Sequence, residues 1–201
     1  MSHGHGHGHG AETSNKTIAI FISCIALLLA LSETMAKGAQ TNQISYNVEA
    51  SNLWAFYQAK TIRQTTLKTA SEQMEVDIGL ARDPGTKTRL EKRVADWKAE
   101  IDRYQSEPKV DPKTGASKGE GRRELMARAI EAEKKRDLYA DKYHLYEIAS
   151  AVFQIALVIT SVYLLTSASL LLWGSAGLCL TGAVLTALGL FAPHLLAPYL
   201  H

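Results

Sequence analysis

Residues 148–190 read IASAVFQIALVITSVYLLTSASLLLWGSAGLCLTGAVLTALGL, and this stretch of 43 residues contains no Asp, Glu, Lys or Arg. Roughly 20 apolar helical residues cross a bilayer core about 30 Å thick, so the stretch is long enough for two crossings. We divide it into membrane helices at 148–166 and 170–190. The short turn between them makes the two helices antiparallel neighbours. The alternative is a buried helical hairpin in a soluble protein.

A third apolar segment lies near the N-terminus. Residues 18–31 have the length of a signal-peptide core and follow Lys16, so cleavage is one interpretation. We favour a retained membrane helix at 17–36, because its apolar character continues with Glu33 as its one acidic or basic residue. Near the interface that carboxylate can reach water. In the membrane helix at 148–166, Gln154 is expected to form a hydrogen bond with a neighbouring helix.

Nearly all the charged side chains lie between the apolar ends. Of the 22 Lys and Arg residues, 21 lie at 37–142, and 18 of the 20 Asp and Glu residues lie at 49–147. We therefore expect a water-exposed domain at 37–147 and a C-terminal tail at 191–201. Lys and Arg cluster shortly before residue 148 and are absent from the tail. The positive-inside rule therefore favours a cytoplasmic middle domain.

The middle domain has a helical pattern with two breaks. Asp83-Pro84-Gly85 is a turn signal, and 108–121 collects two prolines and three glycines among lysines, which is typical of a loop. We expect helices at about 42–79, 87–106 and 122–147, the last running on into the membrane helix. At 1.5 Å per residue the second and third together match the first in length. We therefore expect them to lie in series beside it.

Two apolar repeats predict that these helices pack as coiled coils. The repeat at 87–106 alternates spacings of four and three residues: Leu90, Val94, Trp97, Ile101 and Tyr104. The helix at 42–79 carries a similar repeat: Tyr46, Leu53, Phe56, Leu67, Ala70 and Met74. Lys60 and Arg63 interrupt this second repeat. They either fix register and partner number or mark a drift of the stripe around the helix.

Adjacent aromatic residues suggest that the chain associates with further copies of itself. Trp54, Phe56 and Tyr57 lie within one helical turn, so they cannot all face one narrow partner helix. Small residues every four positions also let membrane helices approach closely. The predicted homo-oligomer interface comprises Leu53, Trp54, Phe56, Tyr57, Leu90, Val94, Trp97, Ile101, Tyr104, Ser175, Cys179, Ala183 and Ala187.

A polar site is an alternative role for part of the helix at 42–79. Four polar side chains follow the aromatic residues: Gln58, Lys60, Arg63 and Gln64. Together they could bind an anion or a lipid headgroup. A charged helix face is more often only solvated.

The run NVEASNLWAFYQAKTIRQT at residues 47–65 resembles the signature of DUF4337, a bacterial family of uncharacterised membrane proteins. The layout of the whole chain is similar to that family: a histidine-rich start, one membrane helix, a charged helical middle and two closing membrane helices. The resemblance implies this fold and residence in a bacterial membrane. It implies no reaction.

The N-terminal residues alternate histidine with glycine. Within residues 1–16, which we expect to be disordered, His3, His5, His7 and His9 could bind Zn or Ni weakly, because neutral imidazole suits these metals. A cloning tag would look similar. No other cofactor is expected.

The sequence therefore predicts an all-α membrane protein with one N-terminal transmembrane helix, a C-terminal transmembrane hairpin and a coiled-coil middle domain. We expect no enzyme, because nucleotide loops, the Gly-x-Ser-x-Gly motif and metal-ligand spacings outside the tail are absent. The favoured function is a self-associating scaffold in the bacterial inner membrane, with lipid and further copies as partners. No nucleic acid or small-molecule substrate is predicted. The alternative is a protein that handles or helps to transport divalent metals through its histidine tail.

Overall fold

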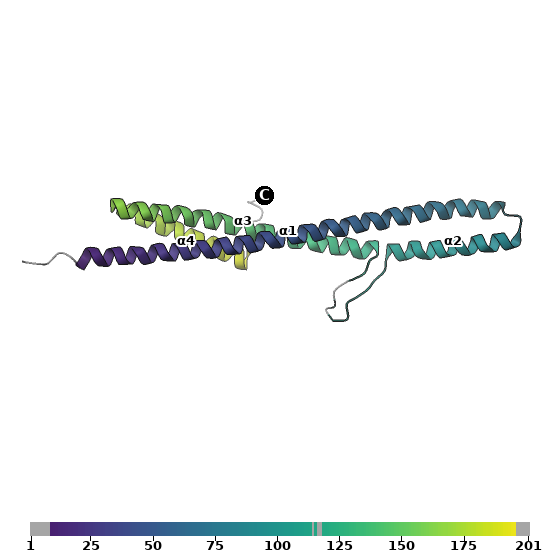
Figure 1. Cartoon of the computed structure of the whole chain (residues 1–201), viewed down its shortest axis with the longest axis horizontal. Helices are drawn as coiled ribbons and strands as arrows, with labels where there is room; N and C mark the ends of the chain where they lie inside the picture. Colours follow the sequence, from purple (N-terminus) through teal and green to yellow (C-terminus); the bar gives the residue numbers. More distant parts are fainter. Residues whose placement is uncertain (1–8, 114, 116–117, 196–201) are drawn as a thin grey trace, which may run out of the picture. The chain divides into compact units, whose positions relative to one another are not determined.

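The regular elements of the described residues are helices. The computed structural model describes residues 9–113, 115 and 118–195, with side chains from Lys16 onward. It contains four α-helices and one short 3₁₀-helix (Figure 1): α1 (His9–Leu80), α2 (Pro84–Gln105), α3 (Arg122–Thr166), α4 (Ser169–Phe191) and η1 (Pro193–Leu195). The all-α prediction is confirmed for this part of the chain.

Helix α1 is longer than the sequence suggested. We expected separate helices at 17–36 and 42–79, but α1 is continuous over 72 residues. The intervening residues contain no proline, and the glycine among them, Gly38, costs only about 1 kcal/mol relative to alanine inside a helix. Residues 9–16, which we expected to be disordered, are also helical.

Local hydrogen bonds explain where two helices begin and end. The Asp83 carboxylate accepts hydrogen bonds from the Thr86 backbone N–H at 2.7 Å and from the Thr86 hydroxyl at 2.8 Å, so it caps α2, and Pro84 fits the first turn. The Thr86 hydroxyl is the main cause of the lowered pKa of Asp83. At the end of α3, Ser167 adopts a left-handed conformation with φ 54° and donates its N–H to the Tyr163 carbonyl at 2.8 Å.

The chain divides into two compact units, each with its own core. Unit 1 comprises residues 1–44 and 137–201, and unit 2 comprises residues 45–136. Helices α1 and α3 contribute residues to both units, whereas α4 belongs to unit 1 and α2 to unit 2.

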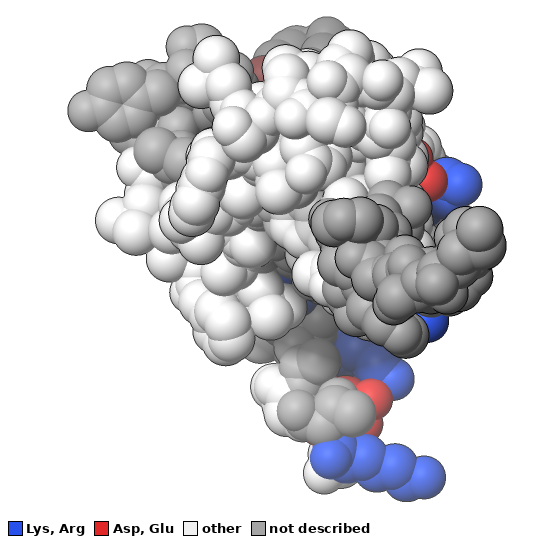
Figure 2. Space-filling model, turned by 90° about the vertical axis from the view of Figure 1, so that its left-hand side faces the viewer, with Lys and Arg blue, Asp and Glu red and all other residues white. Residues whose placement is uncertain are grey.

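Unit 1 contains the apolar segments. Helices α1, α3 and α4 are each long and apolar enough to cross a membrane. Most of the described surface shown in Figure 2 is uncharged, and acidic and basic residues appear only towards its edge. In the core, Phe153 packs with Ile25, Ala149 and Ala156. Gln154, for which we expected a hydrogen bond with a neighbouring helix, donates its amide N–H to the Glu33 carboxylate on α1 at 3.2 Å.

Unit 2 consists of the last part of α1, all of α2 and the first part of α3. Figure 1 shows α2 alongside the end of α1, and a Lys98–Glu75 ion pair of 2.6 Å joins these two helices. The start of α3 packs on a more N-terminal part of α1, where Leu125 belongs to the same buried cluster as Leu53 and Ala50. Within unit 2, α2 and the first part of α3 therefore follow one another along α1, in the arrangement that we expected.

Candidate functional site

The side of α1 that packs within unit 2 has a strict repeat. Its residues alternate spacings of four and three, and each is buried or half-buried; we call them the inner seam: Tyr46, Ala50, Leu53, Tyr57, Lys60, Gln64, Leu67, Ser71, Met74 and Ile78. Phe56 and Ala70, which we had placed in this repeat, lie beside it. Phe56 is 63% exposed.

The inner seam forms its densest core with α3. Leu53 is 5% exposed and clusters with Leu125 and Ala129, and Trp54 and Tyr57 pack against the cluster. The two aromatic rings meet edge to face at a centroid distance of 5.5 Å. Of the four residues at 53–57 that we predicted for the oligomer interface, three therefore pack inside unit 2: Leu53, Trp54 and Tyr57. Their burial stabilises the single chain whether or not copies associate.

A hydrogen bond fixes the Trp54 ring. The Trp54 indole N–H donates to the Glu133 carboxylate on α3 at 2.9 Å. The packed ring buries apolar surface, and the hydrogen bond of its N–H fixes the orientation of the ring. Trp54 therefore sets how α1 and α3 are rotated against each other in unit 2.

Arg122, the first residue of α3, joins all three helices of unit 2. Its guanidinium donates hydrogen bonds to the side-chain oxygens of Gln64 on α1 and Gln105 on α2, and to the Tyr57 hydroxyl at 3.0 Å. It also lies 5.0 Å from the centre of the Tyr57 ring, a cation–π distance. This geometry is typical of a structural junction, because fixed donors here meet acceptors from the chain itself.

The four residues of the predicted polar site do not come together. Gln64 belongs to the junction at Arg122, and the Lys60 ammonium lies 4.9 Å from the centre of the Tyr104 ring. Gln58 and Arg63 are exposed. An anion could therefore not contact all four residues together on this helix.

The predicted repeat of α2 packs against the inner seam. Val94 is buried, and Leu90, Trp97, Ile101 and Tyr104 are half-buried. The Gln64 amide donates to the Ile101 carbonyl at 3.1 Å, which links the seam to the backbone of α2. The repeat was identified correctly, and it meets a helix of the same chain.

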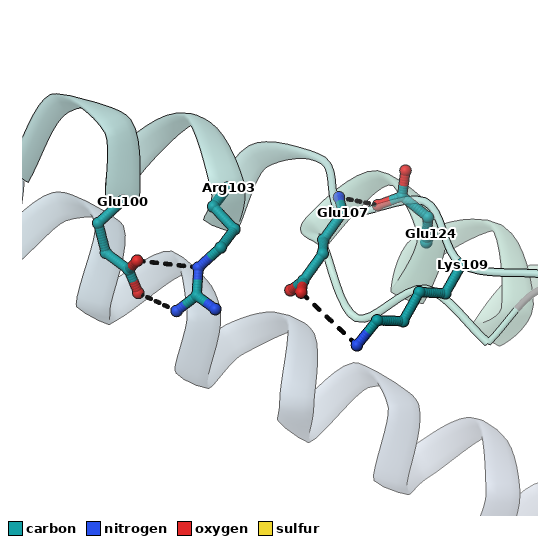
Figure 3. A network of polar contacts seen from close by, with 5 residues as sticks. All are labelled: Glu100, Arg103, Glu107, Lys109 and Glu124. Carbon is teal, nitrogen blue, oxygen red and sulfur yellow. Dashed lines mark hydrogen bonds and ion pairs between the residues drawn. The ribbon is translucent and has the colours of Figure 1, made fainter.

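Glu124 holds the end of α2 to the start of α3. Its carboxylate accepts a hydrogen bond from the Ser106 hydroxyl at 2.6 Å. It accepts a second from the Glu107 backbone N–H at 3.2 Å, which Figure 3 shows. Burial raises the pKa of Glu124, but these hydrogen bonds to its charged form outweigh burial, so the pKa is lowered overall. Nearby, Lys109 pairs with Glu107 at 3.8 Å, and Arg103 with Glu100.

In unit 1 the small residues of α4 receive aromatic rings from α3. A Cβ on Gly182 would lie 2.8 Å from Cε1 of Phe153, and a Cβ on Gly189 would lie 2.6 Å from Cε1 of Tyr146. Both distances are too short for any side chain other than hydrogen, so each glycine makes room for a ring. The rings are seven residues apart on α3, as are the glycines on α4. One layer of packing therefore recurs along both helices.

The predicted small-residue interface overlaps this packing. Ser175 is fully buried, while Cys179 and Ala183 pack against the core around Phe153. Ala187 is exposed. Most of this face is thus covered by the chain itself. The seven-residue spacing of Tyr146 and Phe153, which equals that of Gly182 and Gly189, was the signal in the sequence that could have identified α3 as the partner of this face.

A buried hydroxyl group connects the three helices of unit 1. Ser32 on α1 is fully buried; its hydroxyl donates to the Tyr146 carbonyl on α3 at 3.4 Å and lies 3.1 Å from the Thr186 hydroxyl on α4. In a lipid environment such interhelical hydrogen bonds hold helices together where apolar burial provides little drive. The sequence had not singled out Ser32.

The chain matches the model of a known family along most of its length. A model of the family described as "Domain of unknown function (DUF4337)" matches residues 14–192. The chain belongs to this family. No curated protein and no solved structure matches it. In this DUF4337 protein the aromatic motif turns Leu53, Trp54 and Tyr57 towards the core of unit 2 and leaves Phe56 outside.

The histidine repeat falls largely outside the described residues. His3, His5 and His7 lie there, and His9 begins α1 without a described side chain. Between Lys16 and Leu195, where side chains are described, no group of three or more His, Cys, Asp or Glu residues could hold a metal ion. Weak Zn or Ni binding by the tail stays a prediction.

Proposed function

We propose that this protein is a non-enzymatic scaffold of the bacterial inner membrane that assembles from several copies. Helices α1, α3 and α4 each cross the bilayer once, and the helical middle domain lies in the cytoplasm. The apolar segments of these helices support the membrane part of the proposal. The Lys and Arg residues shortly before residue 148 support the sidedness.

The observation that carries self-association is apolar exposure in unit 2. On α1, Phe56, Ile62 and Val76 are 57–67% exposed. They lie in the charged middle of the sequence, among residues such as Arg63 and Lys68. Burial in a bilayer is therefore unfavourable for this part of α1. Exposed large apolar side chains gathered on one element mark sites of protein association.

The packing inside unit 2 supports a structural role for the middle domain. Alternating spacings of four and three on α1 and α2 are those of a coiled coil, which is suited to holding a long helix straight. Arg122, Gln64 and Tyr57 satisfy one another with hydrogen bonds. These bonds join α1 to α3 within the chain, which supports a structural role for the three residues.

Mass determination of the full chain in detergent tests this function. Multi-angle light scattering with subtraction of the detergent should give a discrete particle of two or more chains. Val76→Glu should shift it towards smaller species, because it places a charge at one of the exposed apolar positions of α1. Val110→Glu is the matched control, since Val110 is 66% exposed but lies in the loop after α2. A wild-type monomer at all concentrations would contradict self-association.

A further inference from the structure

Helix α1 carries a second regular repeat on the side opposite the inner seam. Its residues also alternate spacings of four and three, and we call them the outer stripe: Val48, Asn52, Ala55, Ala59, Ile62, Thr66, Thr69, Gln73, Val76 and Leu80. None is charged and every one is exposed. The stripe begins two residues after the seam begins, which is about 200° around a helix of 3.6 residues per turn.

The uncharged stripe runs through a charged helix. Glu49, Arg63, Lys68, Glu72 and Asp77 all lie between its ends, yet none falls on it. A solvated helix face normally carries such residues. A shallow groove also follows the stripe and is lined by Ile62, Thr66 and Thr69, among others. The repeat of 3.5 residues is the one that keeps a seam facing a second helix over a long distance.

We propose that the outer stripe is where two copies of this chain meet, with their α1 helices side by side and parallel. This inference rests on the proposed self-association and names its surface and its direction. Each layer of the stripe then meets its own copy across a two-fold axis, as an isologous interface requires.

The residue types favour a second copy over other occupants. Asn52, Thr66 and Gln73 make the stripe too polar for acyl chains. It also offers no charge to hold a charged partner. In a symmetric pair each of these groups can form a hydrogen bond with the identical group opposite, so none is buried alone. Ala55 and Ala59 let the backbones approach closely.

The parallel direction follows from two features. Helix α1 is one of the helices that are apolar enough to cross a membrane. Two copies with the same topology in one bilayer therefore have α1 helices that emerge on the same side and run in the same direction. In addition, Asn52 occupies the heptad position at which a single buried asparagine selects two parallel strands and fixes their register.

The available area suits a pair that depends on its membrane anchor. The stripe spans 33 residues, or about 48 Å at 1.5 Å per residue. With a helix about 10 Å wide, roughly 500 Å² per copy and about 1,000 Å² in total would be covered, which is near the lower limit for a specific interface. Confinement of both copies in one bilayer raises their effective concentration and compensates for the small area.

Cysteine cross-linking of the full chain tests the surface and its direction together. Cys24 and Cys179, the two native free cysteines, are first replaced by alanine. Ala59→Cys and Thr69→Cys should each give a disulfide-linked dimer on oxidation in membranes, because parallel pairing places each residue opposite itself within disulfide reach. Lys68→Cys is the matched control: it is exposed and adjacent to Thr69 but points away from the stripe. Its cross-linking should be several-fold lower.

Opposite charges at Ile62 provide a second measurement that a folding defect cannot imitate. Ile62 is 67% exposed, so the chain tolerates charge there. Ile62→Glu should abolish the cross-link at Thr69→Cys, and so should Ile62→Lys. Co-expression of the two variants should restore it as a mixed dimer, because parallel pairing sets residue 62 against itself.

The outcomes separate this inference from the proposed function. Oligomers in detergent without a cross-link at residues 59 and 69 would overturn the outer stripe and leave self-association standing. A cross-link at only one of the two positions would overturn the parallel direction. A monomer in both experiments would overturn both proposals. Cross-links at 59 and 69 with recovery by opposite charges would support the interface.

Discussion

Units 1 and 2 are both helical and both use repeats of seven residues, but different forces hold them together. In unit 1 the rings of Phe153 and Tyr146 enter gaps at Gly182 and Gly189, and the apolar residues are largely on the outside. In unit 2 the buried side is apolar around Leu53, and most of the outside is charged or polar. Both units therefore bury apolar side chains, but they expose opposite kinds of surface.

The membrane location that we propose for unit 1 explains this difference. Lipid tails are as apolar as leucine, so helices in a bilayer gain little from burying apolar groups and associate through close packing and hydrogen bonds. The buried hydroxyl of Ser32 and the ring–glycine contacts are of this kind. In water, burial of apolar surface stabilises a fold by about 25 cal/mol per Å². The Leu53 cluster buries apolar side chains in this way. The comparison predicts that mutations of each kind affect one unit and spare the other.

The largest expected effect is the loss of a core side chain in unit 2. Leu53→Ala should destabilise this unit by about 2–5 kcal/mol, because it removes a buried side chain and leaves a cavity. Hydrogen exchange of the full chain in detergent, followed by mass spectrometry, should show faster exchange around Leu53 and Leu125. Val110→Ala is the control: its exposed side chain predicts a change within about 0.5 kcal/mol. Faster exchange throughout unit 1 would break the comparison.

A smaller effect is expected when a gap in unit 1 is filled. Gly182→Val should destabilise this unit by about 1–3 kcal/mol, because the new side chain collides with the Phe153 ring. Gly177→Val is the matched control on the same helix, since no atom lies within 4 Å of a Cβ there. Unfolding in mixed detergent should separate the two variants.

A double mutant sharpens the same test. Phe153→Leu in the Gly182→Val background should recover part of the lost stability, because the collision is removed, although Phe153→Leu alone should be destabilising. Equal effects of valine at 177 and 182 would show that ring–glycine packing does not hold unit 1.

The sequence predicted helices and breaks well because those signals are local. The break predicted at 83–85 lies where α2 begins, although α2 starts at Pro84 rather than at about residue 87. The residues after Thr166 separate α3 from α4, as expected. It also predicted the apolar segments, since a run of about 20 apolar residues without charge is typical of a helix that crosses a bilayer. The sequence did not predict that α1 continues through Gly38. No residue there is a strong signal for either a helix end or a continuous helix.

The packing partners were harder to predict, because polar residues took part in them. Lys60 looked like an interruption of the repeat, yet it lies in the inner seam with its ammonium over the Tyr104 ring. Gln64 is in the seam as well, with hydrogen bonds to α2 and α3. Their acceptors and rings come from distant segments, which a pattern along one helix does not reveal. The apolar character of Phe56 predicts a place in the seam, but Tyr57 occupies that position in the structure.

The smallest predicted effect depends on pH and concerns the joint between α2 and α3. The pKa of Glu124 is lower in the folded chain than in the unfolded one, where glutamate has a pKa of about 4.3. Its stabilising contribution is therefore fully present above that value and is lost as the pH falls through the folded pKa. Glu124→Gln keeps an acceptor but removes the charge, so at pH 7 it should cost on the order of 1 kcal/mol.

The pH profile distinguishes a charged joint from simple packing. The difference in denaturation midpoint between wild type and Glu124→Gln should shrink as the pH is lowered from 7 to 3, because wild-type Glu124 becomes neutral like glutamine. Glu120→Gln, at an exposed residue in the adjoining loop, should give no such convergence. A difference for Glu124→Gln that stays constant with pH would mean that shape rather than charge joins the two helices. Unit 2 would then depend on close packing in the way that unit 1 does.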